Sequence, residues 1–273
     1  MRGAIEQLAA ILGQAHGLDV SALDEDFLAR AMGKRVEELG LADGSVYLDR
    51  LRDDREEALA FQQSLRVGYS EFFRDPLAFA IVEQMLLPRL MLAAPPGREI
   101  RVWSAGCASG EEAYSVAILL EETTRPRETA IPYRVFATDH RPDALTAARD
   151  GWYEERAVAK VRLGLSRKYF SRVGDGYQVV PALRERLSFS THDLVESNTS
   201  SPPASIYGDF DLILCCNLLF YYRDPWRRTI LEKLHRSLAP GGYLVTGEAE
   251  SPLARNLGIF RPVGPATTVF QKG

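Results

Sequence analysis

The sequence has no long hydrophobic run. No stretch of its 273 residues approaches the roughly 20 apolar residues of a membrane-spanning helix. The segment Met1–Leu12 also lacks the basic start and the long apolar centre of a signal peptide. We therefore expect a cytoplasmic protein that does not insert into a membrane.

Cysteine and histidine are scarce. The three cysteines are Cys107, Cys215 and Cys216, and an odd count with an adjacent pair is not the pattern of a disulfide framework. Their spacing does not suggest a zinc site either, so we expect no metal. Cys107 and Cys215 are interpreted as small packing residues rather than nucleophiles.

Positive charge is not in excess. The formal net charge is −4, which gives no general attraction for nucleic acid or for an anionic membrane. Residues 1–58 hold 13 acidic and 7 basic residues, a net of −6, so the rest of the chain is near +2. This pattern predicts an acidic module followed by a mildly basic one, and a DNA-binding module fits it poorly.

A dinucleotide fingerprint is also missing. No G-x-G-x-x-G follows the first strand-like run, "IRVWSA" at 100–105, which argues against a nicotinamide-dependent dehydrogenase.

The chain has two kinds of sequence pattern, one before and one after about residue 98. In residues 1–58, apolar side chains recur at three- and four-residue steps, and this period predicts helices with one apolar face. The clearest series ends before Gly40, a plausible helix stop, and consists of Leu23, Phe27, Leu28, Ala31, Met32, Val36 and Leu39. Further helices are expected at Tyr47–Leu51 and at Glu56–Arg66.

From residue 98 onward, strand-like runs alternate with amphipathic helices. This alternation predicts βαβ units and a mostly parallel sheet, an α/β fold. The stretch Lys168–Val180 departs from the rhythm and is interpreted as a hairpin, with its turn at Gly174-Asp175-Gly176. Strands are expected at 100–105, 133–139, 187–194, 210–217 and 242–248, and helices at 111–122, 142–150 and 224–238.

The turn after the first strand carries two glutamates. Gly106 and Gly110 allow a tight backbone, and Glu111 and Glu112 then open a helix. A pyrophosphate-binding turn uses backbone N–H groups without competing carboxylates, so these glutamates favour a ligand with an ammonium or sulfonium group. Alternatively, both acids only stabilise the positive N-terminus of the helix.

Polar residues end the strands that follow. Asp139 suits the hydroxyls of a ribose, and Asp193 in "HDL" suits the exocyclic amine of adenine. Asn217 ends the "CCN" run and opens the ligand face. Because ligands of parallel sheets bind beyond the carboxyl ends of the strands, these residues together favour a cationic nucleoside without phosphate, S-adenosylmethionine.

Several motifs resemble the chemotaxis receptor methyltransferases, the CheR family. The resemblance runs from about Ile5 to Phe270, with the motifs in family order. They are "FFRDP" (72–76), "VWSAGCASGEEAYS" (102–115), "FATD" (136–139), "ARDGWY" (148–153), "NLLFYY" (217–222) and "PGGYL" (240–244).

The resemblance implies a fold and an activity. An all-α N-terminal domain (1–58) and a linker with the "FFRDP" motif (59–76) would precede a Rossmann-like class I methyltransferase domain (77–273), with a small antiparallel β-subdomain at about 160–185. The activity would be methyl transfer from S-adenosylmethionine to glutamate side chains on the cytoplasmic helical region of chemoreceptors. In some members the β-subdomain docks a receptor tail. We expect a monomer.

The resemblance also implies site residues. Arg74 and Tyr221 would align the reacting groups, and Tyr221 matches the family tyrosine near the transferred methyl. Cofactor contacts would fall on Ser70, Arg74, Gly106, Glu112, Asp139, Asp193, Leu194, Asn217 and Leu218. The alternative for Arg74 and Tyr221 is ordinary packing in a linker and a core.

Three positions depart from the family pattern. Gly68 stands where many members have asparagine, and Cys216 replaces an arginine. The second N-terminal helix, rich in Arg and Lys in well-studied members, has only Arg30, Lys34 and Arg35 here, preceded by the acidic run 24–26. Two alternatives therefore stay open: a methyltransferase for another signalling protein or a small acid, and a non-catalytic adaptor that binds the cofactor.

The proposed chemistry needs no general base. A glutamate acceptor has a pKa of about 4.3, so its carboxylate is already ionised at neutral pH. The absence of a Ser-His-Asp or Cys-His set is consistent with this reaction.

Overall fold

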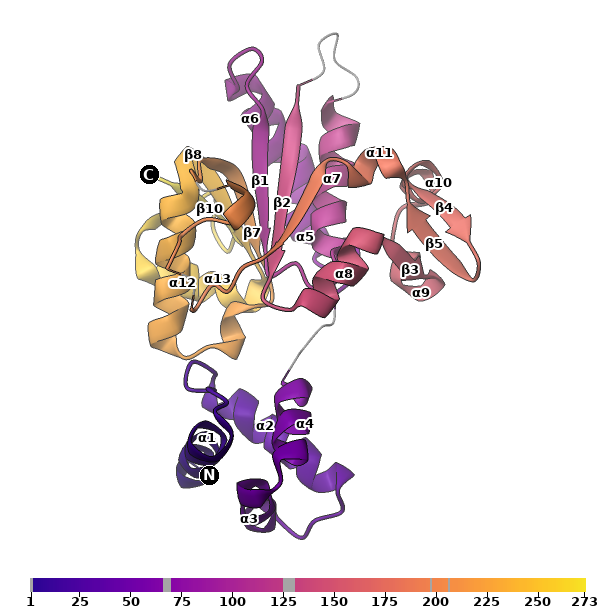
Figure 1. The fold of residues 1–273 in the computed structure, drawn as a ribbon. Helices are drawn as coiled ribbons and strands as arrows, with labels where there is room; N and C mark the ends of the chain where they lie inside the picture. Colours follow the sequence, from indigo (N-terminus) through magenta and orange to yellow (C-terminus); the bar gives the residue numbers. More distant parts are fainter. Residues whose placement is uncertain (1, 66–69, 125–130, 197, 206) are drawn as a thin grey trace. The chain divides into compact units, whose positions relative to one another are not determined.

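The computed structural model describes residues 2–65, 70–124, 131–196, 198–205 and 207–273 (Figure 1). The chain divides into two compact units. One comprises residues 1–67 together with 220–227, and the other comprises residues 68–219 and 228–273. Gly68 and the end of the helix expected at Glu56–Arg66 lie outside the described residues.

The first unit is helical, as the apolar periodicity predicts. An aspartate precedes each of its last three helices and accepts backbone N–H groups of the first turn, namely Asp24, Asp43 and Asp54. The buried core contains Leu8, Leu28, Tyr47, Leu51 and Phe61. The helices are α1 (Arg2–His16), α2 (Glu25–Glu38), α3 (Gly44–Asp53) and α4 (Arg55–Ser64).

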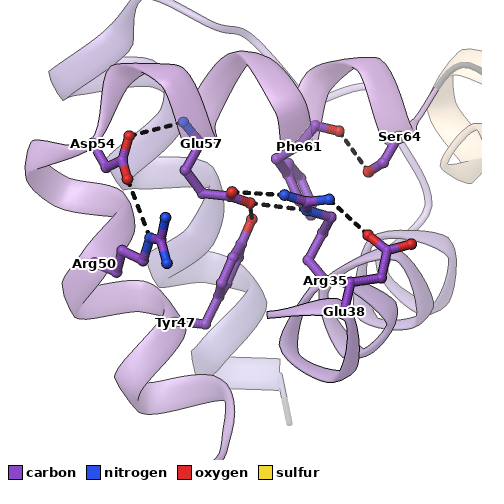
Figure 2. A network of polar contacts seen from close by, with 8 residues as sticks. All are labelled: Arg35, Glu38, Tyr47, Arg50, Asp54, Glu57, Phe61 and Ser64. Atoms are coloured by element: carbon purple, nitrogen blue, oxygen red, sulfur yellow. Dashed lines mark hydrogen bonds and ion pairs between the residues drawn. The ribbon is translucent and has the colours of Figure 1, made fainter. Parts of the chain in front are cut away.

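A polar network joins three of these helices (Figure 2). The Glu57 carboxylate on α4 is 4% exposed and accepts from Arg35 Nε at 2.9 Å and Nη2 at 2.7 Å, and from the Tyr47 hydroxyl at 2.8 Å. Arg35 also donates to Glu38 at 2.6 Å. Arg35 therefore points into the helical unit, and its charge is used there rather than on the outer face of α2.

The second unit is built on a seven-stranded sheet with the order β6-β2-β1-β7-β8-β10-β9. The first five strands in this order are parallel, and β10 runs antiparallel to β8 and β9. The predicted α/β fold is confirmed. The elements are β1 (Ile100–Ala105), α7 (Glu111–Thr124), β2 (Tyr133–Asp139), α8 (Pro142–Asp150), β6 (Leu187–Thr191), β7 (Phe210–Cys215), α12 (Asp224–Ser237), β8 (Leu238–Thr246), α13 (Ser251–Leu257), β9 (Phe260–Pro262) and β10 (Val269–Lys272).

The strand order reverses between β1 and β7. From β1 the chain builds outward through β2 to β6, and it then returns to add β7 and β8 on the other side. At such a reversal the loops after the two central strands diverge, which leaves room for a ligand at the carboxyl edge. The fold thereby predicts where the site lies.

A helical stretch at residues 76–93 packs near β1. It consists of α5 (Pro76–Ile81), the π-helical turn η1 (Val82–Leu86) and α6 (Leu87–Ala93). Within the described part of the chain it is the one stretch long and apolar enough to cross a membrane, judged by length and composition alone. The sequence pattern predicted no helix here. Its inner side chains join a core with strand residues, including Phe79, Val82, Leu86, Leu90, Val102 and Val135.

The predicted antiparallel insertion is present as a three-stranded sheet, which projects from the side of the larger sheet in Figure 1. Two details differ from the expected hairpin. Lys168 and Tyr169 end a helix rather than begin a strand, and β3 pairs with β5 as a third strand. The elements are β3 (Trp152–Glu154), α9 (Glu155–Val158), α10 (Leu163–Tyr169), β4 (Phe170–Val173), β5 (Gly176–Val179) and α11 (Pro181–Arg184).

Candidate functional site

The turn after β1 is fastened to β2. The backbone N–H groups of Gly106 and Cys107 both donate to Thr138 O, at 2.8 and 2.9 Å. Gly106 has φ +83°, and a Cβ there would lie 2.9 Å from the Leu218 side chain. The backbone angle therefore favours glycine at 106, and any larger residue would also displace the Leu218 side chain.

The two glutamates at the start of α7 have different surroundings. Glu111 is 5% exposed, and its carboxylate accepts from the Ser109 hydroxyl at 2.8 and 2.9 Å and from Ser70. Glu112 is half-buried and accepts from the Ser104 hydroxyl at 2.6 Å and from the Cys216 thiol. The interpretation as a stabiliser of local structure suits Glu111, whereas Glu112 lies between the ends of β1 and β7.

Electrostatics make Glu112 unusual. The pKa of its carboxyl is raised from 4.5 to about 7, mainly by burial and in smaller part by the nearby Glu250 carboxylate. The hydrogen bonds from Ser104 and Cys216 and the charge of Arg74 act in the opposite direction. A carboxyl in this state gains most from a cation placed beside it, because the cation favours the ionised form. The site thus fits a ligand with an ammonium or sulfonium group.

Asp139 ties the end of β2 to its neighbours. One carboxylate oxygen accepts the N–H of Ala108 and the other accepts that of Arg141, both at 2.9 Å. The backbone carbonyl of Asp139 accepts the N–H of His192 at 3.1 Å. These contacts bring the segment after β6, which carries Asp193 and Leu194, beside the turn after β1.

Asp193 folds that segment into a turn. Its Oδ1 accepts the N–H groups of Val195 at 2.7 Å and Glu196 at 3.0 Å. Leu194, which lies between Asp193 and Val195 in the sequence, is buried, at 5% exposure. Asp193 and Leu194 therefore have a defined backbone conformation at the carboxyl edge.

A buried carboxylate holds the turn after β7. Glu250 is fully buried and accepts four backbone N–H groups: Asn217 at 2.7 Å, Leu218 and Leu219 at 2.5 Å each, and Gly247 at 3.0 Å. Asn217 has φ +59°, in the left-handed region that asparagine tolerates better than most residues, and this cluster of hydrogen bonds holds it there.

Glu250 was not found from the sequence. Within "TGEAE" nothing distinguishes it from the exposed Glu248, and three of its four partners lie on a turn about thirty residues away. Lys233 on α12, which donates to the turn after β6, was missed for the same reason.

The "FFRDP" segment meets the start of α7. Ser70 donates to Glu111, and the Phe73 N–H donates to the Ser115 hydroxyl at 3.0 Å. Arg74 is exposed, yet its charge acts on the Glu112 carboxyl. The structure thus places Ser70, Arg74 and the predicted residues of the strand ends within one unit. The predicted cofactor-binding residues that lie at the strand ends and on α7 are Gly106, Glu112, Asp139, Asp193, Leu194, Asn217 and Leu218.

Tyr221 belongs to the helical unit, through the segment 220–227. Its carbonyl accepts the Asp24 N–H at 2.8 Å, and its ring meets that of Phe27 edge-on, with centroids 4.9 Å apart. Arg223 Nε donates to Leu23 O at 2.9 Å. The segment that carries Tyr221 is thus anchored to the beginning of α2.

The acidic run before α2 takes part in this anchoring. Asp24 Oδ2 accepts from Arg227 at 3.0 Å, and Glu25 lies 3.8 Å from Arg223. Asp26 is exposed. Two of the three acids that stand where family members often carry basic residues therefore have internal partners.

Known proteins resemble the chain over most of its length. A family model described as "CheR methyltransferase, SAM binding domain" matches residues 69–264. Chemotaxis protein methyltransferase 1 of Pseudomonas aeruginosa is 30% identical over 256 residues, which are 90% of this chain and 89% of that protein.

Two further relatives extend this picture. A probable biofilm formation methyltransferase, WspC, of the same species is 28% identical over 270 residues, 98% of this chain and 61% of that protein. An uncharacterized 104.1 kDa protein of Rhodobacter capsulatus is 30% identical over 250 residues, 91% of this chain. The chain spans a quarter of the length of that last relative.

Proposed function

Because the chain belongs to the CheR methyltransferase family, we propose that it methylates glutamate side-chain carboxylates of chemoreceptors, with S-adenosylmethionine as the methyl donor. The observation that carries the proposal is the Glu112 carboxyl beside the Gly106 turn, with a pKa of about 7 and no phosphate-binding fingerprint near it. A cationic nucleoside is the ligand that this arrangement favours.

Each predicted residue has a role in the proposal. Glu112 binds the cationic end of the cofactor, and Asp139 accepts from the ribose hydroxyls. Asp193 and Leu194 bind adenine. The remaining cofactor contacts are Ser70, Arg74, Gly106, Asn217 and Leu218.

When bound, the cofactor supplies a methyl group on a sulfonium, which leaves as a neutral thioether. The acceptor carboxylate is ionised at neutral pH, so the protein contributes alignment rather than a base. Arg74 makes a bidentate contact with a carboxylate, and Tyr221 directs its hydroxyl toward the reacting atoms. Together they hold the reacting atoms about 3–3.5 Å apart.

The test is transfer of tritium from labelled S-adenosylmethionine to receptor fragments from the same organism. A glutamate methyl ester releases the label as methanol in mild base. Base-stable label points to another acceptor atom and contradicts the proposal. Calorimetric binding of the cofactor without turnover on any fragment supports the adaptor alternative instead.

A second candidate substrate is a signalling protein less acidic than a chemoreceptor. Of the basic residues on α2, Arg35 is engaged with Glu57 and Glu38, and Lys34 lies 3.7 Å from Glu38. The exposed charged residues of α2 are three acids and two bases, namely Asp26, Arg30, Lys34, Glu37 and Glu38. These residues have no positive excess for an acidic receptor helix, and one relative is named for biofilm formation rather than chemotaxis.

The structure sharpens the test of this candidate. Exchange of Asp26 and Glu37 for lysine changes only exposed side chains, whereas exchange of Asp24 or Glu25 breaks internal contacts. If charge limits recognition, the double variant gains activity on an acidic receptor helix, and the gain falls with added salt. An unchanged rate at low salt rules charge out as the obstacle.

The proposed location is the cytoplasm, where the helical region of a receptor is accessible. The three-stranded β3-β5-β4 sheet is the proposed dock for a receptor tail, in line with some family members.

A further inference from the structure

A buried lysine lies behind the turn that follows β6. Lys233 on α12 is only 7% exposed, which is rare for lysine. Its ammonium donates to Leu194 O at 2.8 Å and to Val195 O at 3.4 Å. Burial lowers the pKa of this ammonium, while the Asp193 carboxylate acts to raise it.

The turn is consequently held from two sides. Its N–H groups, those of Val195 and Glu196, point to the Asp193 carboxylate. Its carbonyl groups, those of Leu194 and Val195, point to Lys233. Both of these bonds go to Oδ1, so we assign Oδ2 as the acceptor for a ligand, in a direction that the turn determines.

The same turn is linked to the rest of the site. The His192 N–H donates to Asp139 O, and the His192 ring meets Trp103 edge-on at 5.8 Å. The residue before Asp193 is thus fixed against β2 and β1, and the residues after it are fixed by Lys233. We therefore expect the position of Asp193 to depend on the contacts that Lys233 makes.

We propose that Lys233 is a positioning residue for base recognition: it holds the Leu194 and Val195 carbonyls so that the Asp193 carboxylate meets the exocyclic amine of adenine. The inference deepens the proposed function, since it rests on the proposed role of Asp193. Nothing in the sequence pattern suggests it, because Lys233 lies about forty residues from the turn it holds.

The test compares two ligands by calorimetry with the full chain. One is S-adenosylhomocysteine, and the other is its analogue with purine in place of adenine, which lacks the amine. Lys233→Met keeps most of the side-chain volume and removes the donors. We expect it to weaken S-adenosylhomocysteine about tenfold, the loss of about 1.4 kcal/mol, and to leave the purine analogue nearly unchanged.

Three comparison variants complete the experiment. Lys233→Gln keeps a neutral donor and should restore part of the discrimination, and it also serves if Lys233→Met does not fold. Asp193→Asn should abolish the preference for adenine. Arg228→Met is the matched control, an exposed cation on the same helix whose loss should affect neither ligand.

The outcomes distinguish a failure of the positioning role of Lys233 from a failure of the proposed adenine contact of Asp193. If Asp193→Asn removes the preference for adenine but Lys233→Met weakens both ligands equally, or neither, the positioning role is wrong and the cofactor site stands. If the wild-type protein binds both ligands alike, Asp193 does not read the amine, and both the inference and this part of the proposed function fall.

Discussion

The guanidinium of Arg227 donates to the Asp24 carboxylate at 3.0 Å, across more than two hundred residues of sequence. Asp24 also caps α2, accepting the N–H groups of Asp26 and Phe27, and its own N–H donates to Tyr221 O. One side chain therefore both starts a helix and fixes the segment that carries the proposed aligning tyrosine.

Two substitutions separate these roles of Asp24. Asp24→Asn keeps the cap and loses the ion pair, whereas Asp24→Ala loses both. We expect Asp24→Ala to cost about 1 kcal/mol of unfolding free energy and Asp24→Asn less, measured by urea unfolding. If Tyr221 aligns the acceptor, both lower kcat while the KM for S-adenosylmethionine is unchanged.

The control for Asp24 is Asp43→Ala. Asp43 caps α3 in the same unit and accepts the N–H groups of Ser45 and Val46. It should cost similar stability and leave kcat alone. An equal fall in kcat with both alanine variants would show that only stability of the helices matters.

Cofactor affinity should depend on pH through Glu112. With a pKa of about 7, the carboxyl is mostly protonated at pH 6 and mostly ionised at pH 8. Because the ionised form binds the cation, affinity for S-adenosylmethionine should rise about tenfold from pH 6 to pH 8. Calorimetry at fixed ionic strength measures this.

Two variants assign that pH dependence. Glu112→Gln should bind more weakly with a flat profile, whereas Glu111→Gln should keep the slope. In the ligand-free protein the sign is reversed: a raised carboxyl pKa contributes stability below about 4.5 that is lost as the pH rises toward 7, because the folded chain holds the proton more tightly. A slope retained in Glu112→Gln would assign the titration to another group.

The Glu57 network in Figure 2 should dominate the stability of the helical unit. Glu57→Gln removes the buried counter-ion of Arg35, which keeps its bond to Glu38, and should cost about 1.5–3 kcal/mol. Tyr47→Phe removes one hydrogen bond to a charged group and should cost about 1.5–3 kcal/mol. Thermal unfolding checks both, with the exposed Glu56→Gln as control.

The same network predicts acid sensitivity. Burial alone would raise the pKa of Glu57, but hydrogen bonds from Arg35 and Tyr47 outweigh it and lower the pKa below 4.5. This stability is therefore present above pH 4.5 and is lost as the pH falls below it. Glu57→Gln should show a flatter acid limb than the wild type. A parallel acid limb in the variant would contradict this assignment.

The Gly106 turn offers a steric test. Gly106→Ala places a Cβ at φ +83° and 2.9 Å from Leu218, so we expect a loss of about 1–2 kcal/mol from backbone strain together with weaker cofactor binding. Adding Leu218→Ala should relieve the contact but not the strain. Stability is measured by urea unfolding and affinity by calorimetry with S-adenosylhomocysteine.

Gly13→Ala is the matched control for that test. Gly13 lies inside α1, and among the described residues nothing lies within 4 Å of the place that a Cβ would take, so alanine should stabilise the helix by up to about 1 kcal/mol. Unchanged cofactor binding in Gly106→Ala would mean that the turn is not part of the site.

Local patterns predicted most of the fold. Apolar period and strand-helix alternation placed β1, β2, α7 and α8 within a residue or two, because burial on one face repeats along the chain. The helices of the stretch 76–93 were not predicted because Glu83 and Arg89 interrupt its apolar residues, although its inner face packs in the core. β3 was not predicted because a strand of three residues is too short to show an alternation of apolar and polar residues.

The sequence by itself determined the order of the elements and the polar residues at their carboxyl ends, since these depend on neighbours along the chain. Only the tertiary structure decided which glutamate of the pair lies between the ends of β1 and β7, that Arg35 turns inward, and that Glu250 and Lys233 hold the two turns. These depend on partners twenty or more residues away, or on whether water or protein surrounds a carboxylate, and no local period encodes either.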